Sequence, residues 1–293
     1  LFNVLFPVFL TIAIGYWYGK KDPKFDTKFI TTFSGTFGLP CIIFYSLTVS
    51  NIDFQVFVKF SYYIIIYVGI FSIIGIVVLK FLNRDAVRLL PPLILPNTGN
   101  MGIPICLFAY GSEGLGVAAA ISSLIILFHF TLGVFLADRK FNFEVILKSP
   151  PFYTIIISVL LLYYEIELPV FIENTSFLLM YATIFLILMS LGIALTRLKI
   201  FSFFKALISS IGRLILGPII GLSIIYYYEL DGFAAGVLLI QCSMPSAILN
   251  YLVGSIYSPK KIVDNIASMI VVSTLLSFIT IPIVVFFALK YFS

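Results

Sequence analysis

Two interrupted segments in a very apolar chain carry most of the groups that could do chemistry. The first is LPNTGNMGIPI, residues 95–105, which contains two prolines, two glycines, two asparagines and a threonine. The second is QCSMPSAILNY, residues 241–251, with Pro245 near its centre. Proline removes a backbone donor and clashes with the preceding turn, so each segment predicts a broken helix. At membrane depth such breaks are tolerated only where protein buries them or where they line a water-filled cavity.

The polar groups at the two breaks suit a negatively charged ligand. Pro104 fits the first turn of a helix that resumes after the first break. The exposed amides and the positive dipole end of such a half-helix attract an anion. We therefore expect substrate-binding residues at both breaks, namely Asn97, Thr98, Gly99, Asn100, Gly102, Pro104, Gln241, Ser243, Pro245, Ser246, Asn250 and Tyr251. The alternative is that these groups only satisfy the backbone that the prolines free.

Two titratable side chains lie deep in apolar segments. Arg213 either faces a substrate cavity, as charges inside membranes usually do, or snorkels to the interface near Lys205. His129 is either a proton relay, because histidine titrates near neutral pH, or a packed and hydrogen-bonded histidine. No Asp or Glu falls within the core of an expected span. Ion coupling through membrane carboxylates is therefore not expected.

Enzyme chemistry and bound cofactors are not expected either. The chain has one histidine and three cysteines, and the cysteines all fall in apolar segments, so no Cys/His metal cluster can be built. It has no HExxH motif and no intramembrane pair of aspartates. DPKFD, residues 22–26, fits a diphosphate–Mg²⁺ pattern, but it stands once in a short loop with four lysines. We expect no catalytic residue, no metal and no cofactor.

The composition predicts a polytopic α-helical membrane protein. Of the 293 residues, 61% are hydrophobic and 11% are charged, and the mean hydropathy is +1.14. Soluble domains carry roughly 25% charged residues, so this chain has too little charge to cover a water-facing surface. Its apolar stretches have the length that spans a bilayer as a helix. We expect ten spans, at about residues 1–19, 29–50, 58–80, 89–110, 114–136, 150–167, 175–196, 204–228, 232–254 and 263–290.

The basic residues predict how these spans are oriented. Short loops that are rich in Lys and Arg stay on the cytoplasmic side. Of the 18 basic residues, 15 lie in odd-numbered loops: Lys20, Lys21, Lys24, Lys28, Lys80, Arg84, Arg88, Arg139, Lys140, Lys148, Arg197, Lys199, Lys205, Lys260 and Lys261. We therefore expect both termini outside the cytoplasm of a plasma or inner cell membrane. The net charge of +5 reflects this orientation signal, so no nucleic-acid partner is expected.

The ten expected spans divide into two halves of five. The longest connection, residues 137–150, lies between the fifth and sixth spans. An odd number of spans in each half inverts the second half relative to the first. The two broken segments are the fourth span of each half, and paired interruptions at such positions point to a transporter's binding site. We expect one transporter domain with repeats at residues 1–140 and 148–293.

The motifs PNTGNMGIP (96–104) and MPSAILNYLVGSIY (244–257) resemble those of the auxin efflux carrier family. That family includes plant auxin exporters and bacterial carriers of malonate and malate. The resemblance covers the whole chain, which lacks the long cytosolic loop of plant members and so is similar to a short prokaryotic member. It implies a 5+5 inverted repeat with broken crossover helices four and nine, an architecture similar to bile acid transporters and Na⁺/H⁺ antiporters. It also implies a scaffold of helices 1, 2, 6 and 7 that forms a homodimer, and a transport part of helices 3–5 and 8–10.

These observations predict a secondary transporter in a lipid bilayer. Its substrate is expected to be a small organic anion, a mono- or dicarboxylate such as malate or malonate, or an auxin-like acid. Transport would proceed by alternating access around the crossover. The alternative is a channel or membrane sensor that is gated at the same broken helices. Flux that saturates at low substrate concentration favours the carrier.

Overall fold

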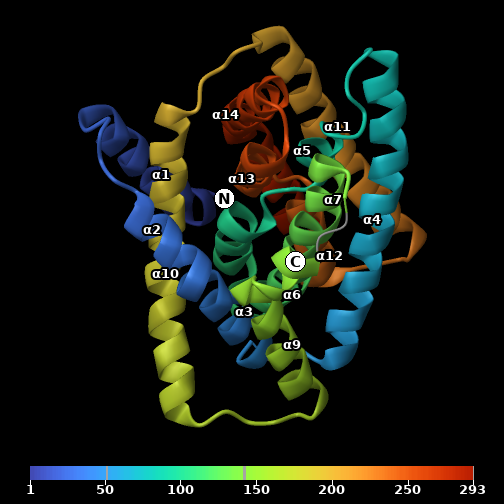
Figure 1. Cartoon of the computed structure of the whole chain (residues 1–293). Coiled ribbons are helices and arrows are strands. Elements are labelled where there is room, and N and C mark those ends of the chain that lie inside the picture. The colour runs from blue at the N-terminus through green and yellow to red at the C-terminus, as the bar shows by residue number, and fades with distance from the viewer. Residues whose placement is uncertain (51, 141–142, 293) are drawn as a thin grey trace.

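The computed structural model describes residues 1–50, 52–140 and 143–292, and the regular elements within these ranges are all helical. The helices pack side by side around a central group of broken helices (Figure 1). In chain order they are α1 (Phe2–Lys21), α2 (Lys28–Phe33), η1 (Ser34–Gly38), α3 (Leu39–Thr48), α4 (Phe54–Phe81), α5 (Leu90–Ile94), η2 (Thr98–Gly102), α6 (Ile103–Phe128), η3 (His129–Gly133), α7 (Val134–Asp138), α8 (Phe143–Leu147), α9 (Pro150–Tyr163), α10 (Val170–Arg197), α11 (Phe203–Tyr227), α12 (Gly232–Cys242), α13 (Ile248–Tyr257) and α14 (Lys260–Tyr291). The η elements are π-helical turns.

Seven helical segments in the described ranges are long and apolar enough to cross a membrane, which makes this a multi-pass membrane protein. Ten spans were expected, and the difference has three physical causes. The helices α12 and α13 are the two halves of one expected span, and each is too short alone. The helix α9 has only 14 residues. The segment Thr98–Asp138 counts as one span of 41 residues although it covers parts of two expected spans.

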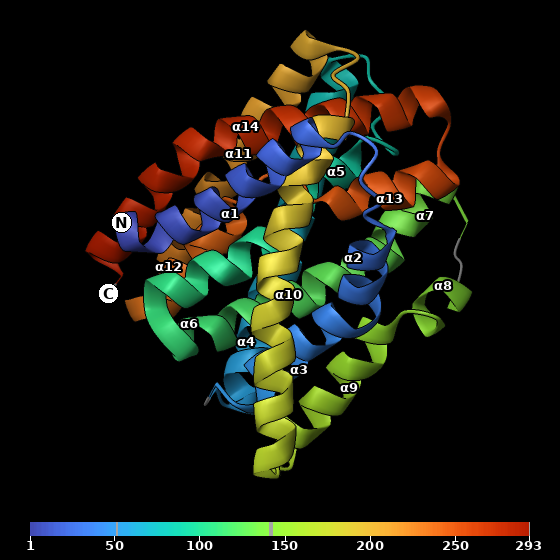
Figure 2. The same cartoon turned by 90° about the vertical axis from the view of Figure 1, so that its left-hand side faces the viewer.

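Gly111 divides that long segment. Its backbone has φ 67° and ψ −151°, so the helical path is interrupted within α6. Glycine adopts a positive φ at little cost because it has no Cβ. Figure 2 shows that the chain reverses direction within α6 before it continues toward α7.

The helices α1 and α10 cross in close contact (Figure 2). A Cβ atom placed on Gly192 would lie 2.0 Å from the carbonyl oxygen of Ile12, so the two backbones touch at this crossing. Small residues allow such an approach between membrane helices, where packing rather than the hydrophobic effect drives association.

The broken segments lie at the centre of the protein. Residues 89–99 are all buried, and so are residues 235–247. The helix α12 packs against α6, α11 and α14, which surround it. A helix that is apolar on all sides is typical of such an interior position. The two breaks are therefore enclosed by other helices.

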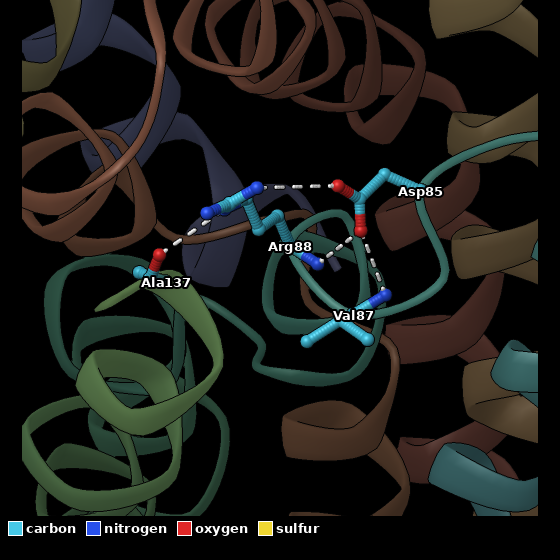
Figure 3. Close-up of polar contacts among 4 residues, drawn as sticks. All are labelled: Asp85, Val87, Arg88 and Ala137. Carbon is cyan, nitrogen blue, oxygen red and sulfur yellow. Dashed lines mark hydrogen bonds and ion pairs between the residues drawn. The ribbon is translucent and has the colours of Figure 1, made fainter. Parts of the chain in front are cut away.

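The loop between α4 and α5 is attached to the end of α7, and Figure 3 shows the contacts. The Asp85 carboxylate accepts hydrogen bonds from the main-chain N–H groups of Val87 and Arg88, at 3.0 and 2.9 Å. Arg88 lies 3.8 Å from the same carboxylate, and its Nε donates to the carbonyl oxygen of Ala137 at 3.3 Å. This loop therefore fixes the start of α5 against the fifth expected span.

Candidate functional site

The two breaks lie side by side. Pro96 and Ser246 form an isolated antiparallel bridge, and the N–H of Asn97 donates to the carbonyl oxygen of Pro245 at 2.8 Å. Asn250 Nδ2 donates to the carbonyl oxygen of Leu95 at 3.3 Å, which links the start of α13 to the first break. Main-chain groups that the prolines free are thus paired between the two segments, as buried backbone groups must be.

The local backbone explains where the helices stop and resume. The helix α5 ends at Ile94, and Leu95 is extended with φ −97° and ψ 105°. A new helical run begins at Thr98, and Pro104 occupies the first turn of α6 as expected. In the second segment α12 ends at Cys242, Ala247 is extended with φ −73° and ψ 141°, and α13 begins at Ile248. Each of the two segments therefore contains a short extended stretch between two helices.

A cavity of about 360 Å³ borders the first break and the start of α13. Its lining includes many apolar side chains: Leu39, Ile125, Ile126, Phe130, Ile187, Leu191, Ile248, Leu249 and Leu252. Its polar lining residues are Thr31, Ser34, Asn97, Thr98, Asn100, His129, Lys148, Ser149 and Ser190. Among the described residues, none of those that line it is acidic. A volume of this size and a mostly apolar wall with a few polar groups are typical of small-molecule sites.

The amino ends of two helical segments border this cavity. Residues 96–100, at the start of the run through η2 and α6, belong to its lining, and so do residues 247–249 at the start of α13. Asn97 Nδ2 and Thr98 Oγ1 are buried and have no hydrogen-bond partner among the described residues. Buried polar atoms without a protein partner are uncommon, so these two are candidates for a ligand contact.

Four of the expected binding residues therefore line the cavity, together with the proposed relay His129. They are Asn97, Thr98, Gly99 and Asn100. The other expected residues stand outside its lining: Gly102, Pro104, Gln241, Ser243, Pro245, Ser246, Asn250, Tyr251 and Arg213. For two of them the hydrogen bonds fit the alternative in which polar side chains satisfy the backbone, because Ser243 donates to the carbonyl oxygen of Leu239 and Asn250 to that of Leu95.

Arg213 is fully buried, which contradicts the alternative in which it snorkels to an interface. Its guanidinium group donates to the carbonyl oxygens of Leu93 and Ile94, at the end of α5. It also donates to those of Cys242, the last residue of α12, and Met244, two residues further on. Its partners are therefore the carboxyl ends of both half-helices that precede the breaks.

His129 lies at the start of η3 and is buried. Its Nδ1 lies 2.8 Å from the carbonyl oxygen of Ile125, which assigns the ring proton to Nδ1 because a carbonyl can only accept. Nε2 has no partner among the described residues and the residue lines the cavity. The ring is thus packed and hydrogen-bonded while one nitrogen stays available.

Several cavity residues were not expected from the sequence. Thr31 and Ser34 come from the second expected span, and Ser190 comes from α10. Small hydroxyl residues in apolar helices usually bond to their own helix, so they give no local sign of a site. Lys148 and Ser149 precede α9 in a loop whose basic residues already had a topological explanation.

Comparison with known proteins identifies the class. A family model described as "Membrane transport protein" matches residues 1–145 and again residues 139–285, so two successive copies of it cover most of the chain. The two matched segments fit an inverted repeat. An uncharacterized transporter of Methanocaldococcus jannaschii is 28% identical in an alignment 300 residues long, which covers 96% of this chain and 96% of that protein. Both findings indicate a transporter rather than an enzyme.

Proposed function

We propose that this chain, which belongs to the membrane transport protein family of the auxin efflux carriers, is a secondary transporter that moves a small organic anion. The chain is a multi-pass membrane transporter, and the proposal adds the substrate class and the mechanism. The observation that carries it is the cavity of about 360 Å³ that borders the amino ends of two helical segments at once.

The electrostatics of this cavity favour a negative substrate. Each amino end carries a partial positive charge of about half an elementary charge. Asn97 and Thr98 add unpartnered polar atoms beside the first of these ends. No acidic side chain among the described lining residues offsets them. A carboxylate would thus find donors and a favourable field, whereas a cation would find neither.

The lysine in the lining contributes little net charge. Lys148 forms an exposed ion pair with Glu144, with 2.5 Å between Nζ and Oε1. The hydrogen bond from Lys148 holds the pKa of the Glu144 carboxyl below its usual range, so both groups are charged at neutral pH. Screened surface pairs of this kind contribute little to binding. The attraction for an anion therefore originates at the helix ends.

The proposed mechanism is alternating access in a ten-span inverted repeat whose fourth and ninth spans cross at the breaks. The pairing of Asn97 with Pro245 supports this crossing, and the two family matches support the repeat. The cavity lining includes Lys148 and Ser149 from the basic loop before α9. Because basic loops are cytoplasmic, this lining supports a cavity that faces the cytoplasm, with both termini on the opposite side.

Competition between an acid and its neutral ester tests the substrate class. A thermal-shift screen of mono- and dicarboxylates against the purified protein first identifies an acid that binds, since a ligand of the native state raises apparent stability. Its methyl ester and its amide are then titrated against it. We expect both neutral analogues to compete far more weakly than the acid. Equal potency of acid and ester, or a preference for an organic cation, would contradict the proposal.

A further inference from the structure

Arg213 occupies an unusual position for a buried charge. It lies in the middle of α11, is 0% exposed, and has no carboxylate within ion-pair distance among the described residues. An uncompensated charge in such a place is very costly, so its compensation must come from other groups. Those groups are main-chain carbonyls, and the donor–acceptor distances are 2.9 Å to Cys242, 3.1 Å to Met244, 3.2 Å to Leu93 and 3.3 Å to Ile94.

These carbonyls belong to two helix ends that carry negative partial charge. The last carbonyls of a helix have no partner in their own helix, and each carboxyl end carries about half an elementary negative charge. Leu93 and Ile94 close α5, Cys242 closes α12, and Met244 lies two residues beyond that helix. Two such ends together come to about one negative charge, which the single guanidinium charge balances.

The surroundings of the guanidinium are shaped to hold it. Its central carbon lies 5.1 Å from the ring centre of Phe71 and 5.8 Å from that of Tyr67, which is within the range of cation–π attraction. The hydroxyl of Tyr67 donates to the carbonyl oxygen of Cys242 at 3.0 Å, so the same carbonyl is held from two sides. The helix α4 thus completes the enclosure around the charge.

We propose that Arg213 is a positioning residue, a built-in cation that ties the carboxyl ends of both half-helices to α11 and so keeps the two breaks in register. Its planar fork of five donors reaches both ends at once, which the compact ammonium group of lysine cannot do equally well. The consequence for transport rests on the proposed function: the amino ends beside the cavity are held in place by a charge that the substrate does not contact.

Amide hydrogen exchange measures this register without any substrate. The reporters are the N–H of Asn97, which donates to Pro245, and the N–H of Ser246, which donates to Ser273 Oγ at 3.2 Å. In Arg213→Ala we expect peptides that contain these amides to exchange about tenfold faster or more, because buried carbonyls lose their partners. Peptides of α10 serve as an internal reference, because a general destabilisation of the protein would raise their exchange rates as well.

Two comparisons separate positioning from simple packing. Methylguanidinium at millimolar concentration should slow exchange at the breaks of Arg213→Ala, whereas tetramethylammonium, which has the charge but no donors, should not. Arg213→Lys should give an intermediate rate. The matched control is Arg197→Ala, because Arg197 also lies near a helix end but donates to Thr27 at the surface; it should leave both reporters unchanged.

The proposal is overturned if the amides at the breaks of Arg213→Ala exchange at the wild-type rate. It is also overturned if methylguanidinium and tetramethylammonium slow exchange equally in this variant. If Arg213→Ala does not fold, the test uses Arg213→Lys and Arg213→Gln instead. Equal rates of amide exchange at the breaks in these two variants would also overturn the proposal. Because no substrate is present in any of these measurements, their failure would leave the organic-anion proposal intact. The failure of the acid–ester competition would likewise leave the role of Arg213 intact.

Discussion

Replacing Gly102 with alanine should report directly on the contact between the two broken segments. A Cβ on Gly102 would lie 2.1 Å from Oε1 and 2.8 Å from Cδ of Gln241. Gln241 is fully buried, so its side chain has little room to move away. The amide of Gln241 has no hydrogen-bond partner among the described residues, so the substitution costs packing energy and breaks no hydrogen bond.

Gly99 provides a matched control three residues away. A Cβ there would meet its nearest neighbour, Ile126, at 3.8 Å, which is ordinary van der Waals contact. Both glycines lie in η2, so the gain in backbone propensity from alanine is about the same in each variant. The difference between Gly102→Ala and Gly99→Ala therefore isolates overpacking, which costs about 1–3 kcal/mol.

The assay is thermal unfolding of the purified variants under identical conditions. For chains of a few hundred residues 1 kcal/mol corresponds to about 2–4 °C, so Gly102→Ala should melt about 2–12 °C below Gly99→Ala. Adding Gln241→Ala removes the obstacle and should recover most of this difference, since residues in contact show coupled effects. Equal melting temperatures of the two glycine variants, or no recovery in the double variant, would refute the contact between the breaks.

Two further predictions concern the ligand and the topology. Asn100→Ala should lower the affinity for the acid identified by thermal shift by about ten- to hundredfold, because a hydrogen bond to a charged ligand is worth about 1.5–3 kcal/mol. The control is Asn265→Ala, which removes an exposed amide that is hydrogen-bonded to its own helix and lies outside the cavity lining. It should leave the affinity unchanged. Single cysteines placed at Asp53 and Glu229 should react with an impermeant thiol reagent added outside cells, and a cysteine at Lys260 should not. Reaction of all three cysteines from one side would contradict the proposed orientation.

Much of the fold could be predicted from the sequence because membrane helices follow simple rules of length and charge. The helices α4, α10, α11 and α14 lie within a few residues of expected spans. The breaks were also predictable, since proline and glycine act on the backbone locally. The turn at Gly111 lies in the expected connection between the spans at about residues 89–110 and 114–136, where glycines follow Tyr110 within a few residues.

The site could be predicted only in part. Residues 97–100, which the sequence offered as substrate-binding residues, line the cavity where a helix resumes, and their binding of substrate stays a prediction. The opposite wall, with Thr31, Ser34 and Ser190, depends on how distant helices pack, and no local pattern encodes that. For Gln241 and Asn250 the sequence indicated polarity at the break and left open whether the side chain would face a ligand or the protein.

Arg213 shows why a charge in a sequence is hard to interpret without its surroundings. The sequence gives its distance from Lys205 along the chain, and that distance allowed a path to the interface. What decides its role is the set of carbonyls opposite it, which come from α5 and α12, far away in the sequence. In this protein Arg213 contacts the carboxyl ends of the half-helices that precede the breaks, whereas the cavity borders the amino ends of the helical segments that follow them. If the carboxyl ends were left without a cation, their negative field would oppose the positive field that the amino ends present to an anion only a short distance away. If the substrate is an anion, as proposed, the guanidinium group would favour its binding without touching it, because the guanidinium charge cancels the negative field of the carboxyl ends.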